Sequence, residues 1–290
     1  MIVPKNPHLD LAAIADSGQC FRWRRREDGY VIPALGSVLR VREMAEGTLE
    51  LSCPEEEFER LWRGYFDLDT DYETMTAILP QEDEYLRAAA DYGRGIRILR
   101  QDPWETLISF LISQRKNIPA IRQAVKKLCQ AAGRVIGEDE IGPVYAFPSP
   151  AELARLGEEG LRACALGYRA PYVMRAAEVF SDTDLDGFCG LEDEALLKAL
   201  CNLYGVGPKI AQCVMLFGFH RLNAFPVDVW IRRVEEMRYP GGLRPERFAP
   251  FAGVMQQYMY AYERYLELNK EQKNRPDCSD RFSCGFSQSS

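Results

Sequence analysis

A lysine at the start of a predicted helix is the residue of this sequence best placed to do chemistry. Residues 203–213 read LYGVGPKIAQC, and the pattern predicts a helix over 208–218 with Lys209 in its first turn. The first turn of a helix carries a partial positive charge from unpaired N–H groups. An ammonium group is misplaced there, so we expect Lys209 to face solvent, to lie beside an anion, or to lose its proton.

Two glycines come just before this lysine. Gly205 and Gly207 allow a tight turn between helices predicted over 192–203 and 208–218. Because glycine has no side chain, backbone N–H groups stay open at the helix N-terminus, where phosphate is the obvious anion. Taken alone, the stretch is explained equally well by an ordinary turn with a surface lysine.

An aspartate begins another predicted helix downstream. In FPVDVWIRR, Pro226 fixes the entry of the chain and Asp228 suits the N-cap of a helix over 228–238. Aspartate caps are common, so Asp228 by itself indicates only a helix start. It becomes a candidate for chemistry because of its distance from Lys209.

The elements that must position these residues fall into two groups. VLRVR at 38–42 and TLELS at 48–52 predict a hairpin, with CFRWRR at 20–25 as a partner strand and a helix over 54–65. From about residue 101 the strand signals stop and helix starts recur, as in DPWE at 102–105 and SPAE at 149–152. Further helices are predicted over 117–132, 168–180 and 250–271. We predict an α+β fold: a small domain over 1–100, a larger all-helical domain over 101–272, and a disordered tail over 273–290.

Composition restricts the class of protein. The chain has 290 residues, 47% hydrophobic and 27% charged, which is typical of globular proteins. The sequence has no apolar run of the roughly 18 residues that a membrane span needs, and its first residues lack the pattern of a signal peptide. Nine cysteines without a C-x-x-C pair suit reduced thiols in the cytoplasm, and two distant histidines make a zinc site unexpected. The net charge of −7 argues weakly against a nucleic-acid partner.

Segments from both predicted domains resemble one family of DNA repair enzymes. The glycine turn with Lys209, followed at a distance by Asp228, resembles the helix–hairpin–helix base-excision DNA glycosylases. Four more segments look like the 8-oxoguanine DNA glycosylase/lyase family, and the match covers roughly residues 10–270: SGQCFRW at 17–23, LRQDPWETLISFLISQRKNI at 99–118, LGYRAPYV at 166–173 and AGVMQQYMY at 252–260. The resemblance implies a small N-terminal antiparallel-sheet (TBP-like) domain followed by a larger helical domain that carries a helix–hairpin–helix.

The resemblance implies roles for the two candidate catalytic residues. Lys209 matches the family's nucleophile, which attacks C1′ of the damaged nucleotide and expels the base; the positive helix end favours the free amine. The resulting Schiff base acidifies the C2′ proton and permits β-elimination of the 3′ phosphate. Asp228 matches the carboxylate that supports the oxocarbenium-like sugar. The implied activity is a bifunctional glycosylase and abasic-site lyase of base excision repair.

The same resemblance implies a pocket for a flipped base. Gln256 matches a residue that contacts the Watson–Crick edge, and Tyr260 and Cys213 match residues that pack on the two faces of the base. Gly18 matches a glycine whose carbonyl accepts a hydrogen bond from N7–H, which 8-oxoguanine has and guanine lacks. Plain structural interpretations remain for two of them, Gly18 as a turn and Tyr260 as a core residue.

Contacts to the rest of a DNA duplex are implied at two loops and at the glycine turn: Arg115, Lys116, Asn117, Tyr168, Arg169, Gly205 and Gly207. Tyr168 and Arg169 match a wedge aromatic and a contact to the base left without its partner. The best-known members differ here, with an asparagine run at 115–117 and an arginine in place of Ala120, and animal members have a histidine in place of Trp230. Recognition of the opposite base therefore transfers least directly.

Despite the acidic composition, cations could gather on one face: Arg22, Arg24–Arg26, Arg115, Lys116, Arg169, Lys209 and Arg232. No cofactor is required by this chemistry, but carbonyls near Cys201, Leu203 and Val206 could hold a cation that bridges to phosphate. An iron–sulfur cluster is not expected, because only Cys278 and Cys284 follow the helical region.

We expect a monomer that binds duplex DNA containing an oxidised purine and no membrane, in the cytoplasm (at the nucleoid if bacterial). Two alternatives remain open. One is a non-catalytic helix–hairpin–helix DNA-binding protein, which would not need the Lys209 amine. The other is a glycosylase for alkylated bases, which generally lacks the lysine.

Overall fold

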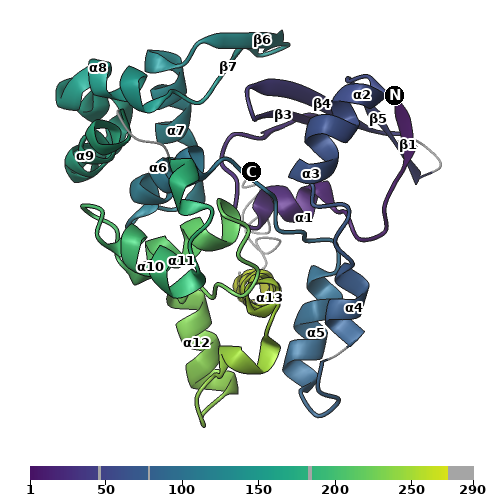
Figure 1. The fold of residues 1–290 in the computed structure, drawn as a ribbon. Coiled ribbons are helices and arrows are strands. Elements are labelled where there is room, and N and C mark those ends of the chain that lie inside the picture. The colour runs from purple at the N-terminus through teal and green to yellow at the C-terminus, as the bar shows by residue number, and fades with distance from the viewer. Residues whose placement is uncertain (45–46, 78, 182–184, 274–290) are drawn as a thin grey trace, which may run out of the picture.

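The computed structural model describes residues 1–44, 47–77, 79–181 and 185–273. An antiparallel sheet near the N-terminus forms one side of the molecule, and a larger group of helices forms the rest (Figure 1). This arrangement confirms the predicted α+β fold. The predicted disordered tail lies outside the described residues, apart from Lys273 at the end of the last helix.

The N-terminal sheet has five strands in the order β1-β5-β4-β3-β2, all antiparallel. The predicted hairpin is confirmed, with Val41 of β4 opposite Leu51 of β5. Helix α1 and the helical segment after β5 pack on this sheet, because their apolar side chains share its buried cluster. The strands are β1 Ile2–Pro4, β2 Arg24–Arg25, β3 Gly29–Ala34, β4 Ser37–Met44 and β5 Thr48–Leu51.

The helices recur through the remainder of the chain, with short 3-10 or π turns at several ends. They are α1 Leu11–Asp16, α2 Glu55–Glu57 running through a π turn Phe58–Trp62 into α3 Arg63–Tyr65, α4 Tyr72–Ala77, α5 Glu84–Gly93, α6 Pro103–Ser113, α7 Ile118–Ala132, α8 Pro150–Leu161 with a π turn Arg162–Leu166 and a 3-10 turn Gly167–Arg169, α9 Ala170–Ser181, a 3-10 turn Leu185–Phe188, α10 Asp193–Cys201, α11 Pro208–Phe217, α12 Val229–Arg238, a 3-10 turn Pro245–Phe248 and α13 Ala252–Lys273.

The predicted helix starts are confirmed by their caps. The Asp102 carboxylate accepts the Glu105 N–H at 2.7 Å, with Pro103 in the first turn. Ser149 and Glu152 form a complete capping box at the start of α8. These local hydrogen bonds fix where α6 and α8 begin, as the sequence pattern required.

The predicted strand over 20–25 is mostly wrong, because only Arg24 and Arg25 pair with β3. The preceding residues cross between two hydrophobic cores. Phe21 belongs to the core of the helical part, whereas Trp23 belongs to the core under the sheet. Residues two apart share a face in a β-strand, so Phe21 and Trp23 could not reach different cores from a regular strand.

Part of the chain before residue 100 packs into the core of the helical part. Side chains of α4 and α5, such as Met75 and Leu86, share the buried cluster of the helical part. Helix α5 packs along α13, which lies at the centre of the molecule in Figure 1. The predicted domain boundary near residue 100 stays a prediction. Among the described helices, none is long and apolar enough to cross a bilayer.

A second sheet interrupts the region predicted to be all-helical. Strands β6 Val135–Asp139 and β7 Gly142–Tyr145 form a hairpin between α7 and α8. It projects toward the N-terminal sheet (Figure 1). An isolated two-stranded hairpin has marginal stability, so contacts from a distant part of the chain must hold it, which a local pattern cannot predict.

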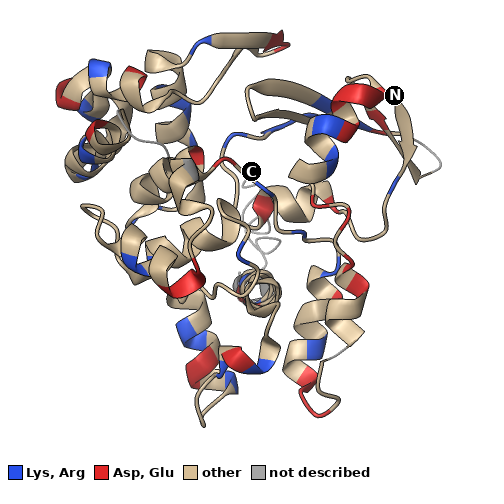
Figure 2. Cartoon of the chain, viewed as in Figure 1, with Lys and Arg blue, Asp and Glu red and all other residues tan. Residues whose placement is uncertain are grey.

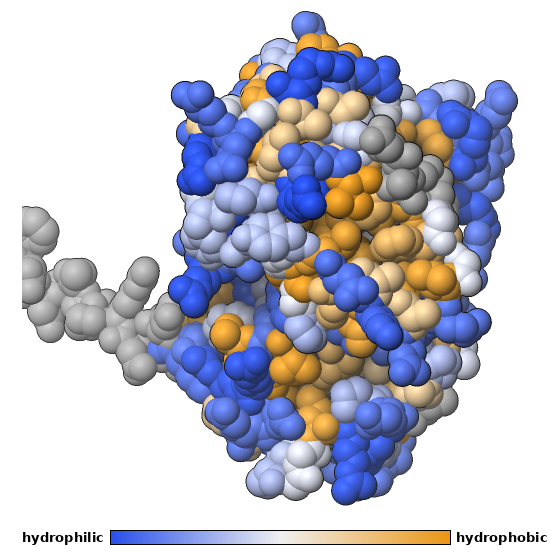
Figure 3. Space-filling view, turned by 60° about the vertical axis from the view of Figure 1, so that its left-hand side comes forward, coloured by the Kyte–Doolittle hydropathy of each residue, from blue (hydrophilic) through white to orange (hydrophobic). Residues whose placement is uncertain are grey.

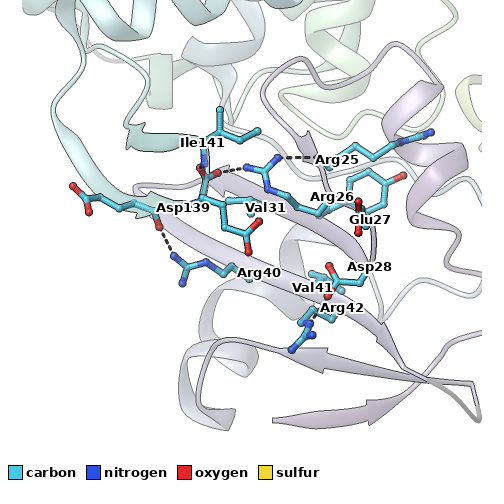
Figure 4. Close-up of a pocket in the computed structure, with 13 residues that line it drawn as sticks. Arg25, Arg26, Glu27, Asp28, Val31, Arg40, Val41, Arg42, Asp139 and Ile141 are labelled. Carbon is cyan, nitrogen blue, oxygen red and sulfur yellow. Dashed lines mark hydrogen bonds and ion pairs between the residues drawn. The ribbon is translucent and has the colours of Figure 1, made fainter.

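Arginines from the N-terminal half hold this hairpin (Figure 4). Arg24 and Arg26 both pair with Asp139, whose side chain is 2% exposed. Arg22 pairs with Glu105 of α6 and donates to the Tyr145 carbonyl at 3.0 Å. We call Arg22, Arg24, Arg26, Glu105 and Asp139 the arginine clasp.

The clasp corrects one expectation about charge. Arg22, Arg24 and Arg26 do not form a free cationic face, because carboxylates and carbonyls already occupy their N–H groups. Arg25, between them, pairs with Asp16. Basic and acidic residues lie interspersed over both parts of the molecule (Figure 2), so net charge says little about any one surface.

Candidate active site

The turn between α10 and α11 positions Lys209. Gly205 has a φ of +85°, and a Cβ there would lie 2.5 Å from the ring of Tyr172. The chain needs glycine at this position for both reasons. Gly207 is the N-cap of α11 without any side-chain cap, and Pro208 begins the helix. The predicted helix–hairpin–helix geometry is confirmed, and Lys209 is exposed in the first turn of α11.

The predicted catalytic and base-binding residues meet in one pocket. It is lined by Ser17, Gly18, Phe110, Lys209, Cys213, Phe217, Pro226, Asp228, Gln256, Gln257 and Tyr260. These side chains come from the loop after α1 and from α6, α11, α13 and the segment leading into α12. Segments that are far apart in the sequence therefore line a single site. We call it the base pocket.

Asp228 is held at the N-cap of α12. Its Oδ1 accepts the N–H groups of Trp230 and Ile231 at 3.0 and 2.9 Å, as a capping aspartate does. Burial raises the pKa of this carboxyl above its usual value, against the opposing effects of the Ile231 N–H and the Lys209 ammonium. Because both of these hydrogen bonds end on Oδ1, Oδ2 is available to interact with a positive charge.

Lys209 has an aromatic neighbour as well as an acidic one. Its Nζ lies 5.3 Å from the centre of the Phe110 ring, within the range at which a ring face attracts a cation. The sequence suggested that Lys209 would face solvent, lie beside an anion or lose its proton. In the structure it has access to solvent and lies near a carboxylate.

Cys213 lies one turn after Lys209 and is buried. Burial raises the pKa of its thiol to about 11, although Lys209 lowers it by charge and by hydrogen bonding. The thiol therefore remains protonated at neutral pH. A neutral thiol is a small apolar group suited to packing against a base rather than to nucleophilic attack.

Gly18 and Tyr260 touch each other across the base pocket. Gly18 has a φ of +79°, and a Cβ there would lie 3.2 Å from the Tyr260 hydroxyl oxygen. Burial raises the pKa of the Tyr260 hydroxyl, so this ring is neutral. The Gly18 backbone therefore lies beside the hydroxyl end of the Tyr260 ring.

Sequence reasoning gave no role in the base pocket to five of its lining residues: Ser17, Phe110, Phe217, Pro226 and Gln257. Phe110 and Phe217 stack on each other with ring centres 5.5 Å apart. Their helical spacing indicated only core positions. Gln257 follows the predicted Gln256 directly in the chain, and its Nε2 donates to Gln256 Oε1 at 2.9 Å. A second amide beside the first was the signal that could have identified it.

The loop between α6 and α7 contains three residues predicted to contact DNA. Arg115 is exposed and has a φ of +51°, which is uncommon for a residue other than glycine or asparagine. Lys116 donates to the Ala165 carbonyl at 3.1 Å. Asn117 caps α7 by accepting the Ala120 N–H at 2.9 Å. Asn117 thus has a structural role, and DNA contacts at these positions stay predictions.

Tyr168 and Arg169 have different environments although they are adjacent. Tyr168 is 48% exposed, whereas Arg169 is 6% exposed. Arg169 donates to the carbonyls of Gln114 and Leu166, and its guanidinium carbon lies 4.3 Å from the centre of the Tyr168 ring. The Tyr168 ring is accessible, although its hydroxyl donates to the Gln114 carbonyl at 3.4 Å, while Arg169 fixes the loop before Arg115. Contacts of these two residues with DNA stay predictions.

An open groove runs beside the base pocket. It has a volume of about 810 Å³ and is lined by Gln114, Arg115, Gly207, Pro208, Lys209, Ile210, Gln212, Phe225, Val227 and Arg232. We call it the cationic groove, because its lining has three cations and no carboxylate. Arg115, Lys209 and Arg232 form no ion pair with any other residue between 1 and 273 that the structure describes.

Apolar side chains near this groove are unusually exposed. Val229 is 74% exposed and Tyr204 is 61% exposed. Figure 3 shows apolar side chains gathered in the middle of one face of the molecule, with hydrophilic side chains around them. Exposed apolar surface with a polar border is typical of a binding surface.

The carbonyls predicted to hold a cation remain a prediction. The Leu203 carbonyl accepts the Val206 N–H at 3.0 Å within the turn, which leaves one of its lone pairs. In the described part of the chain, no cluster of His, Cys, Asp and Glu side chains could hold a metal ion. A cation at the turn would depend on main-chain oxygens. Cys278 and Cys284 lie outside the described residues.

Comparisons with known proteins agree with this geometry. Residues 108–241 match the family model described as "HhH-GPD superfamily base excision DNA repair protein". The chain is thus a member of this class of base excision repair proteins. Residues 1–107 match the model "8-oxoguanine DNA glycosylase, N-terminal domain".

Individual relatives identify the family of the chain within this class of repair proteins. A "Probable N-glycosylase/DNA lyase" of Methanothermobacter thermautotrophicus is 30% identical, over 80% of this chain and 83% of its own. The 8-oxoguanine glycosylase/lyase of Clostridium acetobutylicum, solved with double-stranded DNA containing cytosine opposite 8-oxoguanine, is 32% identical with a TM-score of 0.83. That match covers 92% of this chain and 95% of the other. The chain belongs to the 8-oxoguanine DNA glycosylase family.

A more distant likeness bears on the alternative for alkylated bases. The 3-methyladenine DNA glycosylase of Archaeoglobus fulgidus has a TM-score of 0.74 over 92% of this chain and 99% of its own, but only 19% identity. At that identity the likeness shows a shared fold alone. It gives no support for a shared substrate.

Proposed function

We propose that this protein is a bifunctional DNA glycosylase that excises 8-oxoguanine from duplex DNA and then cleaves the strand at the abasic site. The observation that carries the proposal is the base pocket, where an amine, a carboxylate and a set of base-contacting side chains line one space. Membership of the family and the names of its relatives, N-glycosylase/DNA lyase, support the same activity.

The damaged base must leave the duplex to enter the base pocket, at a cost of a few kcal/mol. The Gly18 carbonyl then accepts N7–H, Gln256 contacts the Watson–Crick edge, and Tyr260 and Cys213 pack on the two faces. Guanine presents an acceptor at N7, so it would leave the Gly18 carbonyl without a donor. Recognition therefore depends on one proton that the lesion adds.

Base excision follows by attack of the neutral Lys209 amine on C1′. The new C–N bond replaces the N-glycosidic bond, and the base leaves with the bonding electrons and takes up a proton. The Asp228 carboxylate stabilises the positive charge that develops on the sugar. Its free Oδ2 and its position near Lys209 support this role.

Strand cleavage uses the same lysine. Ring opening gives a Schiff base between Lys209 and the sugar, which acidifies the C2′ proton. Loss of that proton and of the 3′ phosphate is β-elimination, and hydrolysis then frees the lysine. No cofactor takes part in these steps. We also propose that the carbonyls near Cys201, Leu203 and Val206 bind a cation. The enzyme acts on the chromosome in the cytoplasm, at the nucleoid if bacterial.

A cleavage assay tests the proposal. Single-turnover rates are measured on duplexes with 8-oxoguanine opposite each of the four bases, and on a duplex with 3-methyladenine. We expect cleavage at 8-oxoguanine only. Because Ala120 cannot donate to the opposite base, rates opposite adenine and cytosine should differ by about tenfold or less, which corresponds to about 1.4 kcal/mol. Release of 3-methyladenine without 8-oxoguanine would overturn the proposal.

A further inference from the structure

An arginine outside the base pocket contacts the ring of Tyr260. Arg264 follows Tyr260 by about one turn of α13, and its guanidinium carbon lies 5.4 Å from the centre of the Tyr260 ring. This distance is within the range at which a ring face attracts a cation. Tyr260 lines the base pocket, whereas Arg264 is not among the lining residues. The guanidinium group therefore contacts the ring from a side that does not face the pocket.

The same guanidinium group holds the segment that leads to Gly18. Its Nη1 donates to the Asp16 carbonyl at 2.7 Å, and Asp16 is the last residue of α1. The last carbonyls of a helix lack partners within the helix and carry partial negative charge, so a cation stabilises them. Gly18 follows two residues later. Arg264 thus connects the backbone before Gly18 with the ring of Tyr260.

In the described part of the chain, no carboxylate pairs with Arg264. The nearby Asp16 carboxylate instead pairs with Arg25 at 2.9 Å and lies 3.6 Å from Arg122. Burial raises the pKa of the Tyr260 hydroxyl, and the Arg264 guanidinium acts in the opposite direction. The charge of Arg264 therefore acts on the ring and on the end of α1.

A flipped base in the pocket would touch both of the parts that Arg264 connects. In the proposed function the Gly18 carbonyl accepts N7–H at the edge of the base, while Tyr260 packs on its face. Both contacts form together only if the turn and the ring keep a fixed spacing. A cation against a ring favours one orientation of that ring, and the hydrogen bond to Asp16 fixes the cation relative to the turn.

We propose that Arg264 is a positioning residue for base recognition: it holds the Tyr260 ring at the spacing from the Gly18 turn that a flipped 8-oxoguanine requires. The inference rests on the proposed function and extends it to a residue outside the base pocket. Arg264 acts through Tyr260 and takes no part in the chemistry at the sugar. Its loss should therefore slow base excision and leave cleavage at a preformed abasic site unchanged.

The test is a double-mutant cycle on excision of 8-oxoguanine, in single turnover with saturating protein. Arg264→Met keeps much of the length of the side chain and removes the charge, so excision should slow by about threefold to tenfold. Tyr260→Ala removes the ring and should slow excision by about tenfold or more. Adding Arg264→Met to Tyr260→Ala should change the rate by less than about twofold, because Arg122 still donates to the Ala15 carbonyl and holds the turn.

Two controls separate positioning from general stability. Arg238 is a matched arginine on α12, with its guanidinium carbon 5.0 Å from the centre of the Tyr85 ring, outside the base pocket. Arg238→Met should leave the excision rate within about twofold of the unmodified protein. Cleavage at a preformed abasic site should change by less than about twofold in Arg264→Met, because that substrate has no base to stack on Tyr260.

Three outcomes would overturn the proposal. The first is an unchanged excision rate in Arg264→Met. The second is an equal loss on the abasic site and on 8-oxoguanine, which would make Arg264 a residue of general stability. The third is a pair of losses that multiply in the double variant, which would show that Arg264 does not act through Tyr260. Inactivity of the unmodified protein on 8-oxoguanine would instead overturn the proposed function itself.

Discussion

The arginine clasp and the cationic groove use the same type of side chain for opposite purposes. In the clasp, Arg24 and Arg26 neutralise the buried Asp139 and tie the β6–β7 hairpin to the N-terminal sheet. In the groove, Arg115 and Arg232 lie beside Lys209, and no carboxylate is among the lining residues. A protein with a net charge of −7 can thus keep a local surface positive, because its acidic residues pair with other cations.

The two regions also contain carboxylates whose pKa values move in opposite directions. Burial acts to raise the pKa of Asp139, but the Ile141 N–H and the guanidinium groups of Arg24 and Arg26 outweigh it, and the pKa is lowered. At Asp228 burial outweighs the backbone N–H groups and Lys209, and the pKa is raised. The structural carboxylate of Asp139 is neutralised by its arginine partners. The proposed catalytic carboxylate of Asp228 is less fully stabilised and can still interact with a positive charge.

The largest expected effect comes from breaking the clasp. Asp139→Ala leaves two guanidinium groups without their shared partner, and removal of one partner of a buried pair costs about 3–5 kcal/mol. Because Arg24 is partly exposed, we expect a loss of about 2–3 kcal/mol in the free energy of unfolding, measured by urea denaturation. The exposed pair of Arg42 and Asp28 provides the control, since Asp28→Ala should cost less than about 1 kcal/mol. Equal losses in the two variants would contradict a structural role for the clasp.

The opposite pKa shifts predict a pH window. A carboxyl with a lowered pKa stabilises the fold above its usual value of 3.8 and loses that contribution only below it. Asp228, with a raised pKa, takes up its proton at a pH above 3.8 and then cannot stabilise a cationic sugar. On acidification the excision rate should therefore fall, by about tenfold per pH unit below the inflection, while circular dichroism stays native. Simultaneous loss of rate and fold would contradict the comparison.

A smaller effect is expected from the groove. Arg232→Ala removes a cation without an ion pair, so affinity for duplex DNA should fall by about threefold to tenfold, and the salt dependence should weaken by about one phosphate contact. Stability should change by less than about 0.5 kcal/mol. Arg233, the next residue, is a matched control because it pairs with Glu267. Equal losses in Arg233→Ala, or an unchanged salt dependence in Arg232→Ala, would show that the groove does not bind phosphate.

Local signals determined what the sequence could predict. The caps at Asp102, Ser149 and Asp228 and the glycine turn depend on contacts within a few residues, and the structure has them where the pattern required. The residues of the base pocket come from distant segments, and only the family resemblance brought Gly18, Lys209 and Gln256 together in advance.

Long-range pairing determined what the sequence could not predict. The β6–β7 hairpin is held by arginines more than a hundred residues away, as for Arg24 and Asp139, and its short strands have no strong pattern of their own. For the same reason a list of cations did not distinguish Arg26, which is paired, from Arg232, which is not.

Covalent trapping tests the central claim, that the Lys209 amine is the nucleophile. Borohydride reduces a Schiff base to a stable amine, so the unmodified protein mixed with 8-oxoguanine duplex and borohydride should give a covalent protein–DNA complex. Lys209→Gln should give no such complex and no strand cleavage, while its affinity for the same duplex stays within about threefold, because one cation of the groove is lost. A trapped complex of undiminished yield in Lys209→Gln would contradict the account and show that another amine attacks the sugar.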